Sequence, residues 1–357
     1  MESMEINSTF WKDKNVLITG HTGFKGSWLS LFLKALGSRI HGIALKPENQ
    51  SFFESISNIF DSSHFHNIND FEGLNDLIKK INPDIVFHLA AQSLVNKSYE
   101  DPIETYRTNV IGTLNILQIL RYSINTKCII NVTSDKCYKN DNLGKPFKET
   151  DTLGGHDPYS SSKACVELLS ESFRKSFLLD SDHSINLATV RAGNVIGGGD
   201  WSNNRLIPDI ARSLLSKKIF NVRNPKSLRP WQHVFDPLRG YIILCQNLYT
   251  DNSFSGAWNF GPNSNKNYTV SDVVTYFKNF FSSLEIMNDN HSIKPYESTV
   301  LSLNSTKSKK YLNWEPFLDF HNSLELTAKW YEAYIAKKDM FKFSSDQLNN
   351  YLHNTIK

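Results

Sequence analysis

Short, uninterrupted apolar runs alternate along the first half of the chain with longer segments that carry apolar residues at helical spacing. The runs with the length and β-branched composition of strands lie at residues 15–19, 39–45, 84–91, 128–134 and 185–192. Because they are continuous, they are typical of strands buried on both faces of a parallel sheet. Helices are expected between them at residues 26–36, 104–122 and 160–178. This order predicts an α/β fold, a doubly wound parallel sheet of the Rossmann type.

The pattern changes after residue 193, where loops rich in Gly, Asn, Pro and Trp dominate and helices are expected near 205–216, 270–281 and 322–337. The length of the chain favours two domains. We expect residues 1–193 to form the sheet domain, with approximately 225–262 returning to it. Residues 194–357 would mainly form a smaller domain.

Composition narrows the class of protein. Of 357 residues, 40% are hydrophobic and 21% charged, and the net charge of +3 comes from scattered basic residues, so no nucleic acid partner is expected. Residues 1–14 are polar and no run has the length of a membrane span, which predicts a cytoplasmic protein without membrane contact. The four cysteines form no C-x-x-C pair, which indicates a reducing compartment and gives no sign of a metal site.

Three glycines follow the first strand at spacings of three, namely Gly20, Gly23 and Gly26 in the stretch GHTGFKG. Glycine permits a tight turn and lets a pyrophosphate approach the N–H groups at the start of the next helix. A glycine trio alone is more often a simple turn. Its place between the first strand and the first helix favours a dinucleotide site.

A second constellation is the pair Tyr159 and Lys163, four residues apart in YSSSK at the start of an expected helix. Residues at this spacing share a helix face, and an ammonium group beside a phenol lowers the phenol pKa. A phenol tuned in this way accepts a proton from a sugar hydroxyl while hydride leaves the same carbon. The plain alternative is a Tyr and a Lys on the surface of an amphipathic helix.

The fourth strand ends in Ser134, Asp135 and Lys136, beside the crevice where doubly wound sheets bind ligands. In an extended strand, Asp135 would point to one face and its two neighbours to the other, so all three can meet a ligand only if the strand ends there. The alternative is a solvated ion pair at the strand end.

Over almost its whole length the chain resembles the extended short-chain dehydrogenases/reductases, and among them the nucleotide-sugar 4,6-dehydratases. The stretches that carry the resemblance are GHTGFKGSWL, VFHLAAQSLVNKSYEDPIETYRTNV, TSDKCY, GGHDPYSSSK, VRAGNVIGGGDW and RPWQHV. The resemblance implies an NAD cofactor, a nucleotide-diphosphate sugar as substrate and, on resemblance alone, CDP-glucose. It also implies a homodimer or a dimer of dimers, built from the helices at 104–122 and 160–178, and a role in making lipopolysaccharide sugars.

The resemblance also implies catalytic and binding roles for individual residues. Ser134 would orient the O4 hydroxyl, Asp135 would protonate the leaving C6 hydroxyl, and Lys136 would remove the C5 proton in place of the family's usual Glu. The implied cofactor contacts, besides Tyr159 and Lys163, are Gly20, Thr22, Gly23, Phe24, Gly26, Asn67, Ile68, Leu89, Ala90, Ala91, Asn109 and Thr133. The implied substrate contacts are Gln92, Asn194, Arg205 and Arg229.

Two positions depart from the family pattern at the adenosine end of the cofactor. Lys46 stands where NAD-using relatives usually carry an acid, and a lysine there could instead meet the 2′-phosphate of NADP. Asn67 replaces the first acid of a D-I-x-D adenine contact. NADP therefore stays open as an alternative cofactor.

Two other functions also stay open. A nucleotide-sugar 4-epimerase uses the Tyr–Lys pair but has no use for Asp135 and Lys136. A dinucleotide sensor without catalytic activity would need none of these groups.

Overall fold

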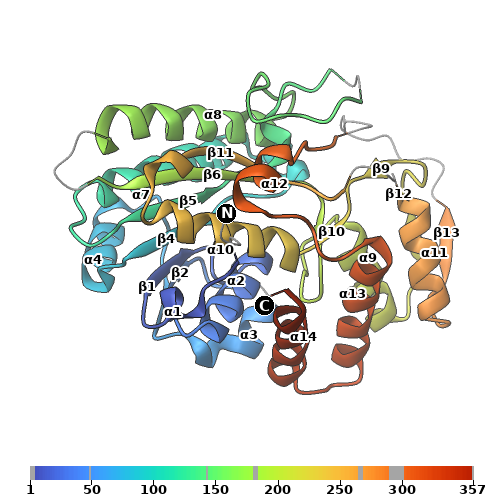
Figure 1. The fold of residues 1–357 in the computed structure, drawn as a ribbon. Coiled ribbons are helices and arrows are strands. Elements are labelled where there is room, and N and C mark those ends of the chain that lie inside the picture. The colour runs from blue at the N-terminus through green and yellow to red at the C-terminus, as the bar shows by residue number, and fades with distance from the viewer. Residues whose placement is uncertain are drawn as a thin grey trace.

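The computed structural model describes residues 5–47, 50–141, 144–179, 184–263, 268–288 and 301–355. Residues 1–4 of the polar N-terminal segment lie outside these ranges. Its centre is a seven-stranded sheet in the order β11-β6-β5-β4-β1-β2-β3, in which every neighbouring pair is parallel. Helices cover both faces of this sheet (Figure 1). The predicted α/β, Rossmann-type fold is confirmed.

The strands of the central sheet are β1 (Asn15–Thr19), β2 (Arg39–Ala44), β3 (Ser62–Phe65), β4 (Ile85–His88), β5 (Cys128–Val132), β6 (Asn186–Ala192) and β11 (Gly256–Phe260). Three two-stranded pairs lie outside it, formed by β7 (Val195–Ile196) with β10 (Gln232–His233), β9 (Leu228–Arg229) with β12 (Tyr268–Thr269), and β8 (Phe220–Val222) with β13 (Ile286–Asn288).

The α-helices are α1 (Ser8–Trp11), α2 (Phe24–Ala35), α3 (Phe52–Ile56), α4 (Phe71–Ile81), α5 (Val95–Glu100), α6 (Pro102–Tyr106), α7 (Gly112–Leu120), α8 (Pro158–Phe173), α9 (Leu206–Ser216), α10 (Phe235–Leu248), α11 (Val270–Phe280), α12 (Thr306–Leu312), α13 (Phe320–Ile335) and α14 (Met340–Thr355). Short 3-10 segments lie at Ser57–Ile59, Asp135–Cys137 and Asn252–Phe254, and π-helical segments at Arg107–Ile111 and Arg174–Leu178.

Side-chain alternation along the strands produces two separate apolar cores. Val16 and Ile18 of β1 belong to the core under α2 and α10, whereas Leu17 belongs to the core under α4, α7 and α8. Both faces of the sheet are therefore buried, which explains why its inner strands read as continuous apolar runs.

Some expected elements differ from the structure. The segment 104–122 is two α-helices joined by a π-helical stretch, and the expected strand 128–134 ends at Val132. Strands β3 and β11 were not among the predicted runs. β3 is an edge strand of sequence SSHF with alternating burial, so it lacks the continuous apolar signal of the inner strands.

Helix α2 and the C-terminal helices are joined through the glycine-rich loop after β7. Trp28 of α2 donates a hydrogen bond of 2.8 Å to the carbonyl of Gly198. A Cβ on Gly198 would lie 1.9 Å from the ring of Trp330, so only glycine fits there. Tyr331 donates to the carbonyl of Asp200 at 2.6 Å. These contacts fix the loop that faces the carboxyl ends of the strands.

Candidate active site

A cavity of about 900 Å³ lies at the carboxyl ends of β1, β4, β5 and β6. Its floor is formed by the turns that follow those strands, and its opposite wall by residues between 193 and 231. Most of the predicted site residues line it: Gly20, Thr22, Gly23, Phe24, Gly26, Asn67, Ile68, Leu89, Ala90, Ala91, Thr133, Ser134, Asp135, Lys136, Tyr159, Lys163, Asn194, Arg205 and Arg229.

Two residues that were predicted to contact ligands, Gln92 and Asn109, do not line the cavity. The backbone N–H of Gln92 donates to Asn109 Oδ1 at 2.8 Å, and Asn109 donates to Ser162 Oγ at 2.8 Å. Asn109 thus joins the loop after β4 to helix α8, and neither it nor Gln92 is among the side chains that line the cavity. Their predicted direct contacts with ligands remain predictions.

The glycine turn has the geometry of a close-approach site. Gly20 has φ of +76°, and a Cβ on it would lie 2.7 Å from the backbone nitrogen of Ala90. A Cβ on Gly26 would lie 2.1 Å from the carbonyl oxygen of Gly20. No side chain caps the start of helix α2, so its first N–H groups are available at the cavity. The positive end of the helix dipole lies there as well, and both features favour binding of an anion.

The 3-10 turn after β5 directs the polar side chains of residues 134–136 to the cavity. Ser134 caps this turn by accepting the N–H of Lys136 at 3.2 Å, and its hydroxyl donates to Asp135 Oδ1 at 3.0 Å. Because the strand ends at Val132, the alternation of an extended strand no longer applies, and Ser134, Asp135 and Lys136 all line the same cavity.

Asp135 is a buried acid rather than half of a solvated ion pair. It is 3% exposed, and burial raises its pKa, although the nearby charge of Lys136 and the hydrogen bond from Ser134 oppose this. Its second oxygen, Oδ2, has no hydrogen-bond partner in the part of the chain that the structure describes. A carboxyl group held in this way favours its protonated form and is suited to donating a proton.

Tyr159 and Lys163 lie in the first turns of α8, whose N-terminus is capped by Asp157. Burial raises the pKa of Tyr159 to about 12, while a hydrogen bond with Ser134 and the charge of Arg205 lower it. Burial lowers the pKa of Lys163 to about 8, and its ammonium donates to the carbonyl of Val132 at 3.4 Å. The pKa of Tyr159 in the protein alone is therefore raised and not lowered as expected from the lysine: burial outweighs the hydrogen bond with Ser134 and the charge of Arg205.

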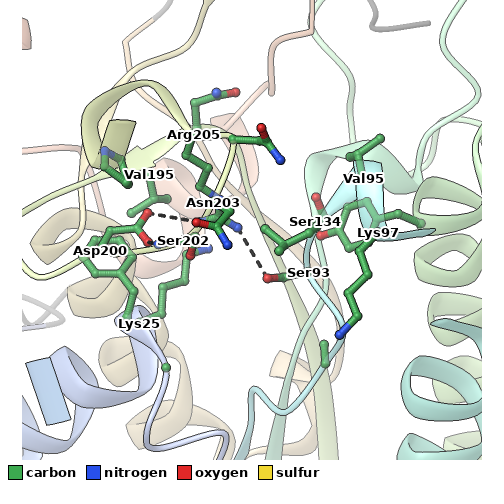
Figure 2. Close-up of a pocket in the computed structure, with 18 of the residues that line it drawn as sticks. Lys25, Ser93, Val95, Lys97, Ser134, Val195, Asp200, Ser202, Asn203 and Arg205 are labelled. Carbon is green, nitrogen blue, oxygen red and sulfur yellow. Dashed lines mark hydrogen bonds and ion pairs between the residues drawn. The ribbon is translucent and has the colours of Figure 1, made fainter. Parts of the chain in front are cut away.

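The cavity is also lined by side chains that the sequence interpretation did not single out, among them Lys25, Ser93, Asp200 and Arg223. Arg205 reaches across the cavity, where it pairs with Asp200 at 3.3 Å and donates to Ser93 at 3.5 Å (Figure 2). Burial lowers the pKa of Lys25 to about 8. Lys25 and Asp200 lie inside the stretches GHTGFKG and GGGDW. Their place in these stretches is the sequence feature that could have indicated both as site residues.

Comparison with known proteins identifies the family. The family model for GDP-mannose 4,6-dehydratase matches residues 17–327. The chain belongs to this family, within the extended short-chain dehydrogenases/reductases. A family member from Salmonella typhimurium, CDP-glucose 4,6-dehydratase, is 44% identical over 99% of this chain and 100% of its own length. The dTDP-glucose 4,6-dehydratase of Haemophilus influenzae is 25% identical over 89% of this chain and 97% of its own.

Solved structures show the family fold. The epimerase Mth375 of Methanothermobacter thermautotrophicus has a TM-score of 0.78 at 22% identity and covers 93% of this chain and 97% of its own. The dTDP-glucose 4,6-dehydratase of Bacillus anthracis, solved in complex with NAD, has a TM-score of 0.73 at 23% identity and covers 91% of this chain and 99% of its own. The epimerase, the dehydratase and this chain therefore share one fold, and side chains at the cavity must distinguish the two activities.

Proposed function

We propose that the protein is an NAD-dependent nucleotide-sugar 4,6-dehydratase, a hydro-lyase that converts CDP-glucose to CDP-4-keto-6-deoxyglucose. The observation that carries this proposal is the buried, partly unbonded carboxyl of Asp135 in the same cavity as Tyr159 and Lys163. A 4-epimerase needs the Tyr–Lys pair but has no use for an acid in this position. The 44% identity to a CDP-glucose 4,6-dehydratase supports CDP-glucose among the nucleotide sugars.

The turn at Gly20 and Gly26 fits a dinucleotide, because its two crowded glycines leave the backbone open to a pyrophosphate at the start of α2. Bound NAD would supply an acceptor for the C4 hydride of the sugar and return that hydride to C6. Lys46 is exposed after β2 and is not among the side chains that line the cavity, which supports NAD over NADP.

The oxidation half of the reaction falls to Tyr159. Its phenol oxygen takes the proton from the O4 hydroxyl while the C4 hydride leaves, and Ser134, which hydrogen-bonds with Tyr159, orients that hydroxyl. Tyr159 accepts this proton as the phenolate, so it must first give up its own proton, and the ammonium of Lys163 and the Ser134 hydroxyl stabilise that phenolate. The new ketone at C4 makes the C5 hydrogen acidic.

The elimination half falls to the turn after β5. Lys136 removes the C5 proton, the C5–C6 double bond forms, and the C6–O bond breaks as Asp135 gives its proton to the leaving hydroxyl, so that water departs. Both residues line the cavity, and burial raises the pKa of Asp135, which favours the form that carries a transferable proton. When hydride adds to C6, Lys136 returns its proton to C5. Asp135 regains a proton from solvent, which is balanced by the O4 proton that Tyr159 releases before the next turnover.

The diphosphate of the substrate requires cations on the wall opposite the glycine turn. Arg205 and Arg229 line that wall together with Asn194, and arginine suits phosphate because its planar fork donates two hydrogen bonds. We keep the proposed division into a sheet domain (1–193, with approximately 225–262) and a substrate domain (194–357) on the same grounds, since these groups follow residue 193.

A product assay tests the function and its alternatives. The purified protein is incubated with CDP-, UDP-, GDP- and dTDP-glucose, and the product is examined by mass and by the alkali absorbance of a 4-keto-6-deoxysugar. We expect loss of one water from CDP-glucose. An isomer of unchanged mass would indicate the 4-epimerase, and no product with any of the four would indicate a dinucleotide sensor.

The proposal also covers the location, the pathway and the oligomeric state of the enzyme. No helix in the described ranges is both long and apolar enough to cross a bilayer, and we place the enzyme in the cytoplasm, without a nucleic acid partner, in the synthesis of lipopolysaccharide sugars. A homodimer or a dimer of dimers is supported by exposed apolar side chains on the helical face formed by α5 to α8: Tyr99, Ile103, Tyr106, Ile111 and Leu168.

A further inference from the structure

A buried ion pair lies directly behind the cavity and takes no part in the reaction described above. Glu167 of α8 and Arg191 of β6 are each only 3% exposed at the side chain. Arg191 donates to both oxygens of Glu167, from Nε and from Nη2, each at 2.8 Å. Removing two charges from water costs free energy that their attraction barely offsets, so a pair of this kind is weak evidence for a role in stability.

The pair holds both ends of the segment that contains the elimination residues. At the first end, Glu167 accepts a hydrogen bond from Thr133, the residue before Ser134. At the other end, Arg191 Nη1 donates to the hydroxyl of Tyr138 at 2.6 Å, and that hydroxyl donates to Asn259 at 2.8 Å. Asp135 and Lys136 lie between these two anchors.

The same pair is joined to the oxidation residues. Glu167 follows Lys163 by one helical turn on the same face of α8. Lys163 donates to the carbonyl of Val132, the last residue of β5, so α8 contacts the end of β5 through two consecutive residues, Val132 and Thr133. The helix that carries Tyr159 and the turn that carries Asp135 therefore share one buried network.

We propose that Glu167 and Arg191 are positioning residues, which hold the elimination residues at a fixed distance from the oxidation pair so that both act on one bound sugar. This inference rests on the proposed function, because it needs two half-reactions at neighbouring carbons. A displacement of about 1 Å at a reacting group lowers rates by as much as about 10²-fold, so a segment that is held at both ends serves the second half-reaction directly.

The test removes one anchor and leaves the ion pair intact. Tyr138→Phe deletes the hydroxyl that joins Arg191 to the segment but keeps the ring, which stacks on Phe147 at 4.8 Å. We expect oxidation at C4 to continue while elimination slows about tenfold, the scale of one lost hydrogen bond to a charged group. Reduced cofactor should then accumulate, and exchange of solvent deuterium into C5 should fall.

Tyr351→Phe is the matched control. The Tyr351 hydroxyl is also buried and donates to a carboxylate, Asp236 Oδ1, at 2.7 Å, but it lies outside the cavity lining. Both variants should lower the melting temperature to a similar extent, and only Tyr138→Phe should change the balance between the half-reactions. In the protein without ligands, amide hydrogen exchange over residues 133–138 should also rise only in Tyr138→Phe.

The outcomes distinguish a failure of the proposed function from a failure of the positioning role of Glu167 and Arg191. If the unaltered protein forms no 4-keto-6-deoxysugar, the proposed function is wrong, and the exchange measurement alone then decides whether the pair holds the segment. If the unaltered protein is active and Tyr138→Phe slows both half-reactions equally, or matches Tyr351→Phe in exchange, the ion pair is merely structural and the inference is overturned.

Discussion

At the level of single residues, burial has more influence than neighbouring charge on the acids and bases of the cavity. It raises the pKa of Asp135 and Tyr159 and lowers that of Lys163. Each shift favours the neutral form of its group. Burial therefore favours the protonated, proton-donating form of Asp135, which an elimination needs and which a solvated strand-end carboxylate would favour less.

Substitutions at two of these residues should stop the reaction at different stages. Tyr159→Phe should keep nucleotide-sugar binding, measured by calorimetry, and lower turnover by about 10²-fold or more, the usual scale for a positioned proton acceptor. It should form no reduced cofactor. Asp135→Asn removes the transferable proton and should let oxidation proceed, so that the absorbance of reduced cofactor accumulates.

Lys136→Met should behave like Asp135→Asn and should also lose exchange of solvent deuterium into C5. Full turnover in both of these variants would show that the turn after β5 is structural, and the 4-epimerase would then be the better assignment. General loss of folding is recognised separately, because it would lower binding and every rate together.

Asp135→Asn should also stabilise the protein near neutral pH. Because burial raises the pKa of Asp135, ionising it costs more in the folded chain than in the unfolded chain. That cost is absent below the ordinary pKa of Asp, grows as pH rises through the folded pKa, and is constant above it. Thermal unfolding should therefore show a larger gain at neutral than at mildly acidic pH. A gain independent of pH would mean that ionisation is not its source.

Site residues could be predicted from the sequence where a local pattern, such as a turn or a helical spacing, determines their position. The turn at Gly20 and the spacing of Tyr159 and Lys163 are local features, and the cavity contains all three. Asp200 and Ser93 meet only through Arg205, across loops that are far apart in sequence. No local pattern indicates such a contact.

At the level of elements, the inner strands were predictable because they are mainly apolar and buried on both faces, as β4 and β5 are throughout. β11 was missed because its first residues, Gly256 and Ala257, are only partly buried, and its position depends on pairing with β6, which precedes it by a long stretch of chain. The end of β5 was overestimated because Thr133 and Ser134 are buried without being part of the strand.

The β1–α2 turn gives a prediction at this scale. In Gly26→Ala the new Cβ would lie 2.1 Å from the Gly20 carbonyl, so the turn must open, at about 1–3 kcal/mol of stability. NAD binding measured by calorimetry should be lost. Gly256→Ala is the control, since the positive φ of Gly256, +96°, makes an alanine there unfavourable too, but no neighbouring atom lies within 4 Å of the added Cβ. It should lower the melting temperature and keep NAD binding; equal affinity in both variants would remove the turn from the cofactor site.

At the level of the whole molecule, the apolar side chains on α5 to α8 predict self-association through that face. Ile103 is 70% exposed and Leu168 is 60% exposed. Replacing either with Asp should convert the proposed dimer to a monomer, measured by light scattering, because a charge would be buried at the interface. Ile219→Asp is the control, since Ile219 is 50% exposed just before β8. An unchanged mass in all three variants would place the interface elsewhere.

Because β11 lies late in the chain, the central sheet is completed only after most of the protein has been synthesised. Strands β1 to β6 leave the exit tunnel well before Gly256–Phe260, yet β11 is the strand that pairs with the outer side of β6 in the described part of the chain. Until it arrives, β6 presents unpaired N–H and C=O groups, the arrangement that recruits strands from other chains. A nascent chain that stalls before Gly256 is therefore expected to depend on chaperones more than one that has passed Phe260, in which β11 covers the edge of β6.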